Sequence, residues 1–132
     1  MKKVALLVIS IVLILCHSSY AGGIDDVLNS AKREGKLVML EVGSEDCVPC
    51  EKMKPVIEKL KTNYKGKLEV IFVDFQKDRD ISWRFGVVVI PTQVFLDKNG
   101  REFNRHNGFY DYWDIFDVMK TQGLDPADVK AR

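Results

Sequence analysis

An excess of charge of one sign is missing from this sequence. Its 132 residues carry 20 lysines and arginines against 19 aspartates and glutamates, which gives a net charge of +1. The charged residues are not gathered into a basic or acidic block either. Proteins that bind nucleic acids or anionic membranes usually carry a basic patch, so the composition supports neither kind of partner.

Long hydrophobic runs are also missing. The one apolar stretch, residues 4–15, follows two lysines and is too short to span a bilayer comfortably. Ser19 and Ala21 place small residues at the positions that signal peptidase inspects. We predict a signal peptide over residues 1–21, cleaved after Ala21, and an exported, periplasmic domain over residues 22–132.

Two other fates of this leader stay open. An uncleaved leader would anchor the protein in the membrane. Lipidation at Cys16 is the other possibility, although Leu15 before it is larger than a lipobox prefers. With cleavage after Ala21, we expect no stable membrane insertion.

Cysteine is scarce, with three residues in the whole chain. Cleavage would remove Cys16 and leave Cys47 and Cys50, separated by Val48 and Pro49. Exported domains that depend on disulfides for stability carry several, so a single closely spaced pair suits a catalytic disulfide better. Haem attachment of the c type is excluded, because it needs a histidine directly after the second cysteine and residue 51 is glutamate.

Three structural interpretations of the pair compete with redox chemistry. A structural zinc site needs four ligands, and after cleavage His106 is the one remaining histidine, so we expect no metal. A purely structural disulfide would close a tiny loop and stabilise the fold little. Two buried, inert cysteines fit poorly with Pro49 and the charged neighbours, which indicate a surface turn.

The pair lies where a predicted strand ends and a predicted helix begins. The apolar run Leu37–Val42 reads as a buried strand, and apolar residues at helical spacing follow over Pro49–Tyr64. Unpaired amides and the dipole at a helix N-terminus favour an anion, here the Cys47 thiolate. A thiolate is the nucleophile of disulfide exchange, and Cys50 is close enough to resolve the mixed disulfide.

The remaining pattern predicts an α/β domain. Helix and strand alternate in the first half, which favours parallel strands, and Asp97-Lys98-Asn99-Gly100 predicts an antiparallel hairpin near the end. The result is a mixed sheet of about four to five strands, flanked by helices on both faces. The further helices are expected near Ile24–Ala31, Asp78–Phe85 and Tyr110–Thr121, and the further strands over Leu68–Phe75, Gln93–Leu96 and Arg101–His106.

These features together resemble the thioredoxin superfamily. Pro49 precedes the second cysteine as in thioredoxin's own motif, and Pro55 falls where thioredoxins carry a helix-kinking proline. Glu41 lies six residues before Cys47, where thioredoxin has a buried aspartate and some Dsb-type relatives have glutamate. The stretch from Gly86 to Thr92 is similar to the family's cis-proline segment. Thioredoxin has tryptophan before the first cysteine, whereas this chain has Asp46.

The resemblance implies a thioredoxin fold over residues 24–121 and a role for each matching residue. Cys47 and Cys50 would form the redox disulfide, with Asp46, Val48 and Pro49 completing the active-site turn. Glu41 would accept a proton from Cys50 as the mixed disulfide resolves. A cis Pro91 would turn the Ile90 backbone toward the cysteines, where it can bind an extended substrate segment. Thr92 would give local support.

We therefore expect an exported thiol–disulfide oxidoreductase that acts on cysteine-containing proteins and needs no separate cofactor. Negative charge at Glu45, Asp46 and Glu51 opposes the thiolate, which favours the reducing direction. A reductant outside the cytoplasm would need a membrane thiol reductant as its electron donor. We expect a monomer.

Two alternatives stay open: a thioredoxin-fold binding or chaperone module, and a dedicated factor for cytochrome or metal-site maturation. Other conspicuous side chains are expected to pack or lie on the surface without a role in the chemistry. These are Trp83, Phe85, His106, Tyr110, Tyr112 and Trp113.

Overall fold

The computed structural model describes residues 23–125. The predicted leader, its cleavage site and Cys16 lie outside these residues, as does most of the tail after Leu124. None of the helices within 23–125 is long and apolar enough to cross a membrane. In chain order the elements are α2 (Ile24–Arg33), β1 (Leu37–Gly43), α3 (Val48–Asn63), β2 (Leu68–Asp74), α4 (Arg79–Arg84), β3 (Thr92–Leu96), β4 (Glu102–Asn107) and α5 (Tyr112–Lys120).

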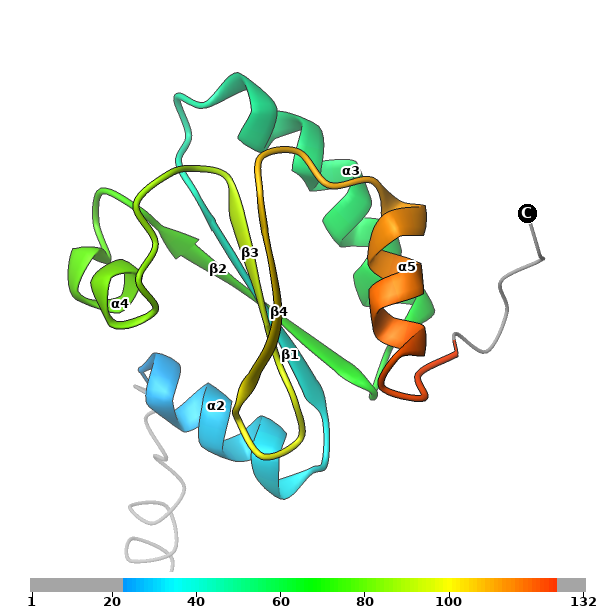
Figure 1. Cartoon of the computed structure of the whole chain (residues 1–132). Helices are drawn as coiled ribbons and strands as arrows, with labels where there is room; N and C mark the ends of the chain where they lie inside the picture. Colours follow the sequence, from blue (N-terminus) through cyan, green and yellow to red (C-terminus); the bar gives the residue numbers. More distant parts are fainter. Residues whose placement is uncertain (1–22, 126–132) are drawn as a thin grey trace, which may run out of the picture.

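The four strands form one mixed sheet in the order β2-β1-β3-β4 (Figure 1). β1 pairs parallel with β2, because α3 carries the chain back across the sheet between them. β1 and β3 are antiparallel, and β3 and β4 form the predicted hairpin. Gly100 has a φ of 80° in its turn, a conformation that glycine adopts without steric cost.

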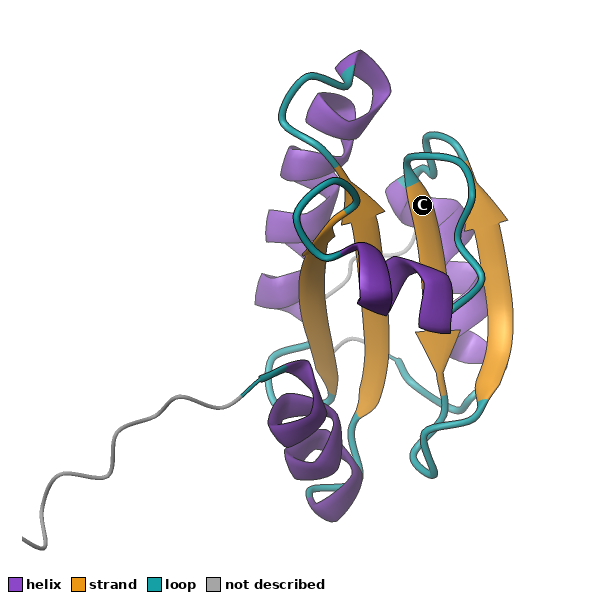
Figure 2. Ribbon diagram, turned by 90° about the vertical axis from the view of Figure 1, so that its left-hand side faces the viewer, coloured by secondary structure: helices purple, strands orange, loops and turns teal. Residues whose placement is uncertain are grey.

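Helices cover both faces of the sheet (Figure 2). Alternate side chains of β1 point to opposite faces, so Leu37 and Met39 pack with α3 and α5, whereas Val38 and Leu40 belong to a second core with α2. This confirms the predicted α/β class and the mixed sheet. Every side chain of β1 is buried, as its apolar sequence predicted.

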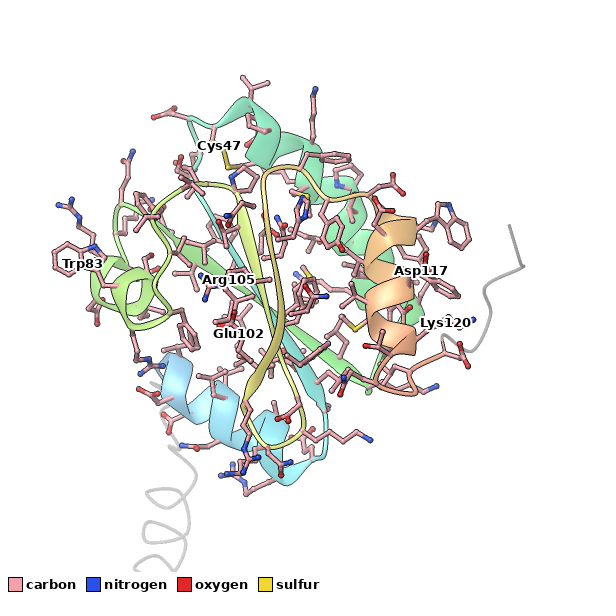
Figure 3. The ribbon with its side chains drawn as sticks, in the orientation of Figure 1. Cys47, Trp83, Glu102, Arg105, Asp117 and Lys120 are labelled. Atoms are coloured by element: carbon pink, nitrogen blue, oxygen red, sulfur yellow. A yellow bond between two sulfur atoms is a disulfide. The ribbon has the colours of Figure 1, made fainter. Side chains whose placement is uncertain are left out.

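The structure adds detail to the sequence expectations at three places. Of the aromatic side chains expected to pack or lie on the surface, Trp83 is 73% exposed on α4, whereas its neighbour Phe85 packs in the second core (Figure 3). α5 begins at Tyr112 rather than Tyr110, because Asp111 caps it by accepting the Trp113 N–H. Pro55 lies within the continuous helix α3 with an exposed side chain.

Candidate active site

Cys47 and Cys50 form a disulfide where β1 runs into α3, with an S–S distance of 2.06 Å (Figure 3). Cys47 is the N-cap residue of the helix, in an extended conformation. Its Sγ accepts a hydrogen bond from the Cys50 N–H at 3.2 Å. An N–H donor and the dipole at the start of a helix favour negative charge on such a sulfur once the disulfide is reduced.

The two sulfurs differ in accessibility. Cys47 is half-buried, whereas Cys50 is only 7% exposed. Val48 and Pro49 between them are exposed, as the surface-turn interpretation predicted. Within residues 23–125 no group of three His, Cys, Asp or Glu side chains could hold a metal, so the pair lacks the further ligands of a structural zinc site. A disulfide or thiol in solution can therefore approach Cys47 more easily than Cys50.

Gly43, the last residue of β1, lets the disulfide lie directly against the strand. A Cβ built at this position would lie 3.2 Å from Cys50 Sγ and 3.5 Å from the Phe72 ring. Any side chain here would press on the sulfur. Sequence analysis did not single out Gly43, because its importance depends on how α3 packs over β1.

Glu41 lies two residues before Gly43 and points to the same face of the sheet. Its side chain is only 1% exposed. Burial raises the pKa of this carboxyl to about 8, and the hydrogen bond that Gln93 donates acts in the opposite direction. With a rise of about 3.3 Å per strand residue, Glu41 lies one side-chain repeat, about 7 Å, deeper than the position next to Cys50.

Gln93 is a second residue of the site that sequence analysis missed. It is fully buried and directly opposite Glu41 in the β1–β3 register. Its Nε2 donates to Glu41 Oε1 at 3.3 Å. A glutamine next to the apolar run Val-Phe-Leu in the strand Thr-Gln-Val-Phe-Leu was the available signal, but the register between β1 and β3 cannot be read from the local sequence.

The loop before β3 reaches the same end of the sheet. The Ile90–Pro91 peptide bond is cis. The Thr92 Oγ1 lies 2.7 Å from the Val89 carbonyl, to which it donates, and 2.9 Å from Asn107 Oδ1. The Gly108 N–H donates to the Pro91 carbonyl at 2.7 Å, which ties the β4–α5 loop to the proline. Thr92 thus supports this loop locally.

Exposed apolar side chains belong to the loops at this end of the sheet. The β1–α3, α4–β3 and β4–α5 loops converge there in Figure 1. Val88 and Val89 in the α4–β3 loop, Phe109 in the β4–α5 loop and Val48 at the start of α3 are between 43% and 82% exposed. Sequence analysis missed Val88, Val89 and Phe109 as surface residues, because apolar residues in loops look like core residues until the fold is known.

Nearby lysines partly compensate the negative charge of the acidic residues near Cys47. Glu45 Oε1 lies 3.7 Å from Lys77 Nζ, and Glu51 Oε1 lies 2.7 Å from Lys54 Nζ. Asp46 forms no such ion pair in the described part of the chain. Of the three acidic side chains, Asp46 therefore carries most of the uncompensated negative charge next to Cys47.

The comparisons with known proteins agree with this geometry. The sequence model for thioredoxin matches residues 24–121. Over 55 residues the chain is 36% identical to a thioredoxin of Borreliella burgdorferi, covering 42% of this chain and 47% of that protein. It is 31% identical over 81 residues to the putative thioredoxin H10 of Arabidopsis thaliana, covering 61% of this chain and 51% of that protein.

The chain thus spans about half the length of these two relatives. Among solved structures, Fasciola hepatica thioredoxin superposes with a TM-score of 0.66 at 22% identity. That superposition covers 74% of this chain and 89% of the other. At this level of identity the superposition supports the fold, which is the four-stranded mixed sheet described above.

Proposed function

We propose that this chain, which belongs to the thioredoxin family, is a thiol–disulfide oxidoreductase that acts on cysteine-containing proteins. The observation that carries the proposal is the Cys47–Cys50 disulfide at the N-terminus of α3, with one accessible and one buried sulfur. This arrangement gives one cysteine to attack a partner and one to release it.

In the reducing direction the Cys47 thiolate attacks one sulfur of a substrate disulfide. A bond forms between Cys47 and that sulfur, and the second substrate sulfur leaves as a thiolate. Cys50 then loses its proton and attacks Cys47. The Cys47–Cys50 bond forms, the mixed disulfide breaks, and the substrate leaves with both sulfurs reduced.

Glu41 is proposed to accept the Cys50 proton in the second step. The carboxyl is buried on the face of β1 that the disulfide covers, about one side-chain repeat deeper, so the proton would pass through a water molecule. The raised pKa, about 8, places its titration close to that of a thiol, which makes proton exchange between the two groups possible.

Stopped-flow measurement of the two steps tests this assignment. Glu41→Gln should slow resolution of a preformed Cys47 mixed disulfide, while the first attack by Cys47 keeps its rate. In the wild type, resolution should accelerate as the pH rises through about 8, because the carboxylate is the form that accepts a proton. Equal resolution rates in both proteins across this range would refute the role of Glu41.

The proposed direction is reduction, with a potential below roughly −200 mV. Asp46 supports this direction. Its uncompensated negative charge lies next to Cys47 and disfavours the thiolate. A strong oxidant needs a reduced form that is stabilised through its thiolate, and Asp46 opposes that stabilisation. Equilibration with glutathione buffers measures the potential. Asp46→Asn should raise it; a wild-type value above about −150 mV, or a fall in Asp46→Asn, would contradict the charge argument.

A binding function is the second candidate, and the exposed Val48, Val88, Val89 and Phe109 favour it. An unfolded client could lie across these side chains and pair with the Ile90 backbone as an added strand. The double variant Cys47→Ser/Cys50→Ser separates the two functions. Suppression of client aggregation that survives in this variant would indicate a binding module, and its loss would indicate redox chemistry.

Export is proposed on the leader sequence alone. Cleavage after Ala21 predicts that the exported protein begins at Gly22. We further propose that it works as a monomer and receives its electrons from a membrane thiol reductant. N-terminal sequencing of the protein recovered from the periplasm tests this. Any other first residue, or a lipid on Cys16, would contradict cleavage after Ala21.

A further inference from the structure

Glu41 and Gln93 form an isolated polar pair inside the core. They are direct cross-strand neighbours in β1 and β3, with exposures of 1% and 0%. One hydrogen bond, from Gln93 Nε2 to Glu41 Oε1, joins them. The other oxygen of each side chain, Glu41 Oε2 and Gln93 Oε1, is buried without a hydrogen-bond partner.

Two unpartnered buried oxygens on neighbouring side chains are costly, because each gives up hydrogen bonds to water. An ionised carboxylate has no proton to donate, so it can only accept. A protonated carboxyl has one O–H, which is the donor that Gln93 Oε1 lacks. A single proton on Glu41 can therefore satisfy both oxygens.

We propose that Gln93 is a positioning residue that binds the protonated Glu41 carboxyl at two points. Its amide N–H donates to one carboxyl oxygen, and its carbonyl accepts the O–H of the other. These two hydrogen bonds close a ring between the amide and the carboxyl group. Rotating the Gln93 amide by 180° exchanges its oxygen and its nitrogen, and the same ring forms with the proton on the other carboxyl oxygen. This inference rests on the proposed function in one respect: the ring is where the proton released by Cys50 would be held.

Within residues 23–125 no cation acts on the carboxyl. The causes that set the pKa of Glu41 are burial and Gln93 alone. Opposite Glu41 on β2 lies Phe72, and α3 contributes Cys50 to this face. Asp74, beside Gly43 in the register, is engaged by Lys77 at 3.3 Å. The amide is thus the group that decides how the proton is held.

Infrared spectroscopy of the oxidised protein tests the ring, because neither cysteine titrates while the disulfide is intact. The carboxylic-acid C=O stretch of Glu41 appears in difference spectra taken well below and well above pH 8, and is assigned by its loss in Glu41→Gln. In Gln93→Met, which keeps the length but not the amide, this stretch should move to higher wavenumber, because its hydrogen bonds are lost. The pKa of Glu41 should not rise, because the two bonds that the neutral form loses offset the single, charge-assisted bond that the ionised form loses.

Tyr64→Phe is the matched control. It removes the Tyr64 hydroxyl, the third buried oxygen without a hydrogen-bond partner in the part of the chain that the structure describes, and should leave both the stretch and the pKa of Glu41 unchanged. An unchanged stretch in Gln93→Met, or a rise in the pKa of Glu41, would overturn the proposal, since a simple N–H donor predicts that rise.

The proposal stays testable if Gln93→Met does not fold. In the wild type the ring predicts that the side-chain carbonyl carbon of Gln93 shifts in NMR spectra as Glu41 titrates, and a carbon that does not respond would overturn it. Both measurements use the oxidised protein, so they are independent of disulfide exchange. If Glu41→Gln resolves the mixed disulfide as fast as the wild type while the spectra show the ring, the proposed catalytic role of Glu41 is refuted and this inference stands.

Discussion

Gly43 controls how closely β1 and the disulfide approach each other. In Gly43→Ala the new Cβ would lie 3.2 Å from Cys50 Sγ, so the sulfur has to move. A free thiol can rotate away more easily than a bonded sulfur, so the oxidised form should be destabilised by about 1 kcal/mol, which raises the reduction potential by about 20 mV. Glutathione equilibration measures this shift.

Gly23→Ala is the control for that substitution, because a Cβ at Gly23 meets nothing within 4 Å. Its potential should equal that of the wild type. A lower potential in Gly43→Ala, or the same shift in both variants, would show that the contact with Cys50 does not matter.

The individual residues of the site were predictable to different degrees. Cys47 and Cys50 could be chosen from their spacing and from their place between a predicted strand and a predicted helix, whereas Glu41 and Pro91 were chosen from the resemblance to the thioredoxin superfamily. Gln93 could not be chosen, since its importance comes from lying opposite Glu41 across a strand pair whose register is set by tertiary structure.

Arg105 joins β4 to the end of α4 and so to the start of the loop that leads to Pro91. Its guanidinium donates to the Phe85 carbonyl at 2.6 Å and to the Gly86 carbonyl at 3.4 Å. Two further bonds, at 2.7 and 2.8 Å, reach the carboxylate of Glu102 (Figure 3). A single flat fork thus holds two carbonyls and a carboxylate, which an ammonium group cannot reproduce.

Arg105→Lys should therefore lower the free energy of unfolding by about 1–2 kcal/mol. Arg101→Lys on the exposed hairpin turn is the control and should be nearly neutral. Urea denaturation compares the two, and amide hydrogen exchange over residues 87–90 should accelerate in Arg105→Lys alone. Equal urea midpoints for the two variants would show that the hydrogen bonds of the Arg105 guanidinium do not stabilise the fold.

The helices and strands were largely predictable because their patterns are local. Apolar runs gave β1 and β2, and the Asp97–Gly100 turn gave the hairpin. The exposure of Trp83 was not predictable, since α4 is short and its orientation depends on contacts made by Ser82 and Phe85 in the folded protein. Arg105 was missed for the same reason: the carbonyls that it binds lie far away in the sequence.

The pH dependence of stability follows from the buried carboxyl. The pKa of Glu41 is raised from 4.5 to about 8, so between these values the folded protein binds a proton that the unfolded chain has released. The free energy of unfolding must then fall by on the order of 4 kcal/mol as the pH rises through this window, and it levels off above the window.

Urea denaturation at pH 5 and at pH 8.5 checks this prediction. The carboxyls of Glu34, Asp74, Asp97 and Glu102 have lowered pKa values through their hydrogen bonds, so their contribution is lost below the window and does not interfere. Glu41→Gln should remove most of the slope between the two pH values. A wild type whose stability rises or stays level across them would show that Glu41 is ionised in the folded protein.

The central claim is that Cys47 and Cys50 exchange disulfides with other proteins. The direct measurement is the rate of insulin reduction by dithiothreitol in the presence of the protein. The wild type should accelerate the reaction, and Cys47→Ser should return it to the uncatalysed rate. Reduced Cys50→Ser, mixed with insulin after dithiothreitol has been removed, should accumulate a mixed disulfide between Cys47 and insulin. An uncatalysed rate with the folded wild type, and no mixed disulfide in Cys50→Ser, would contradict the account.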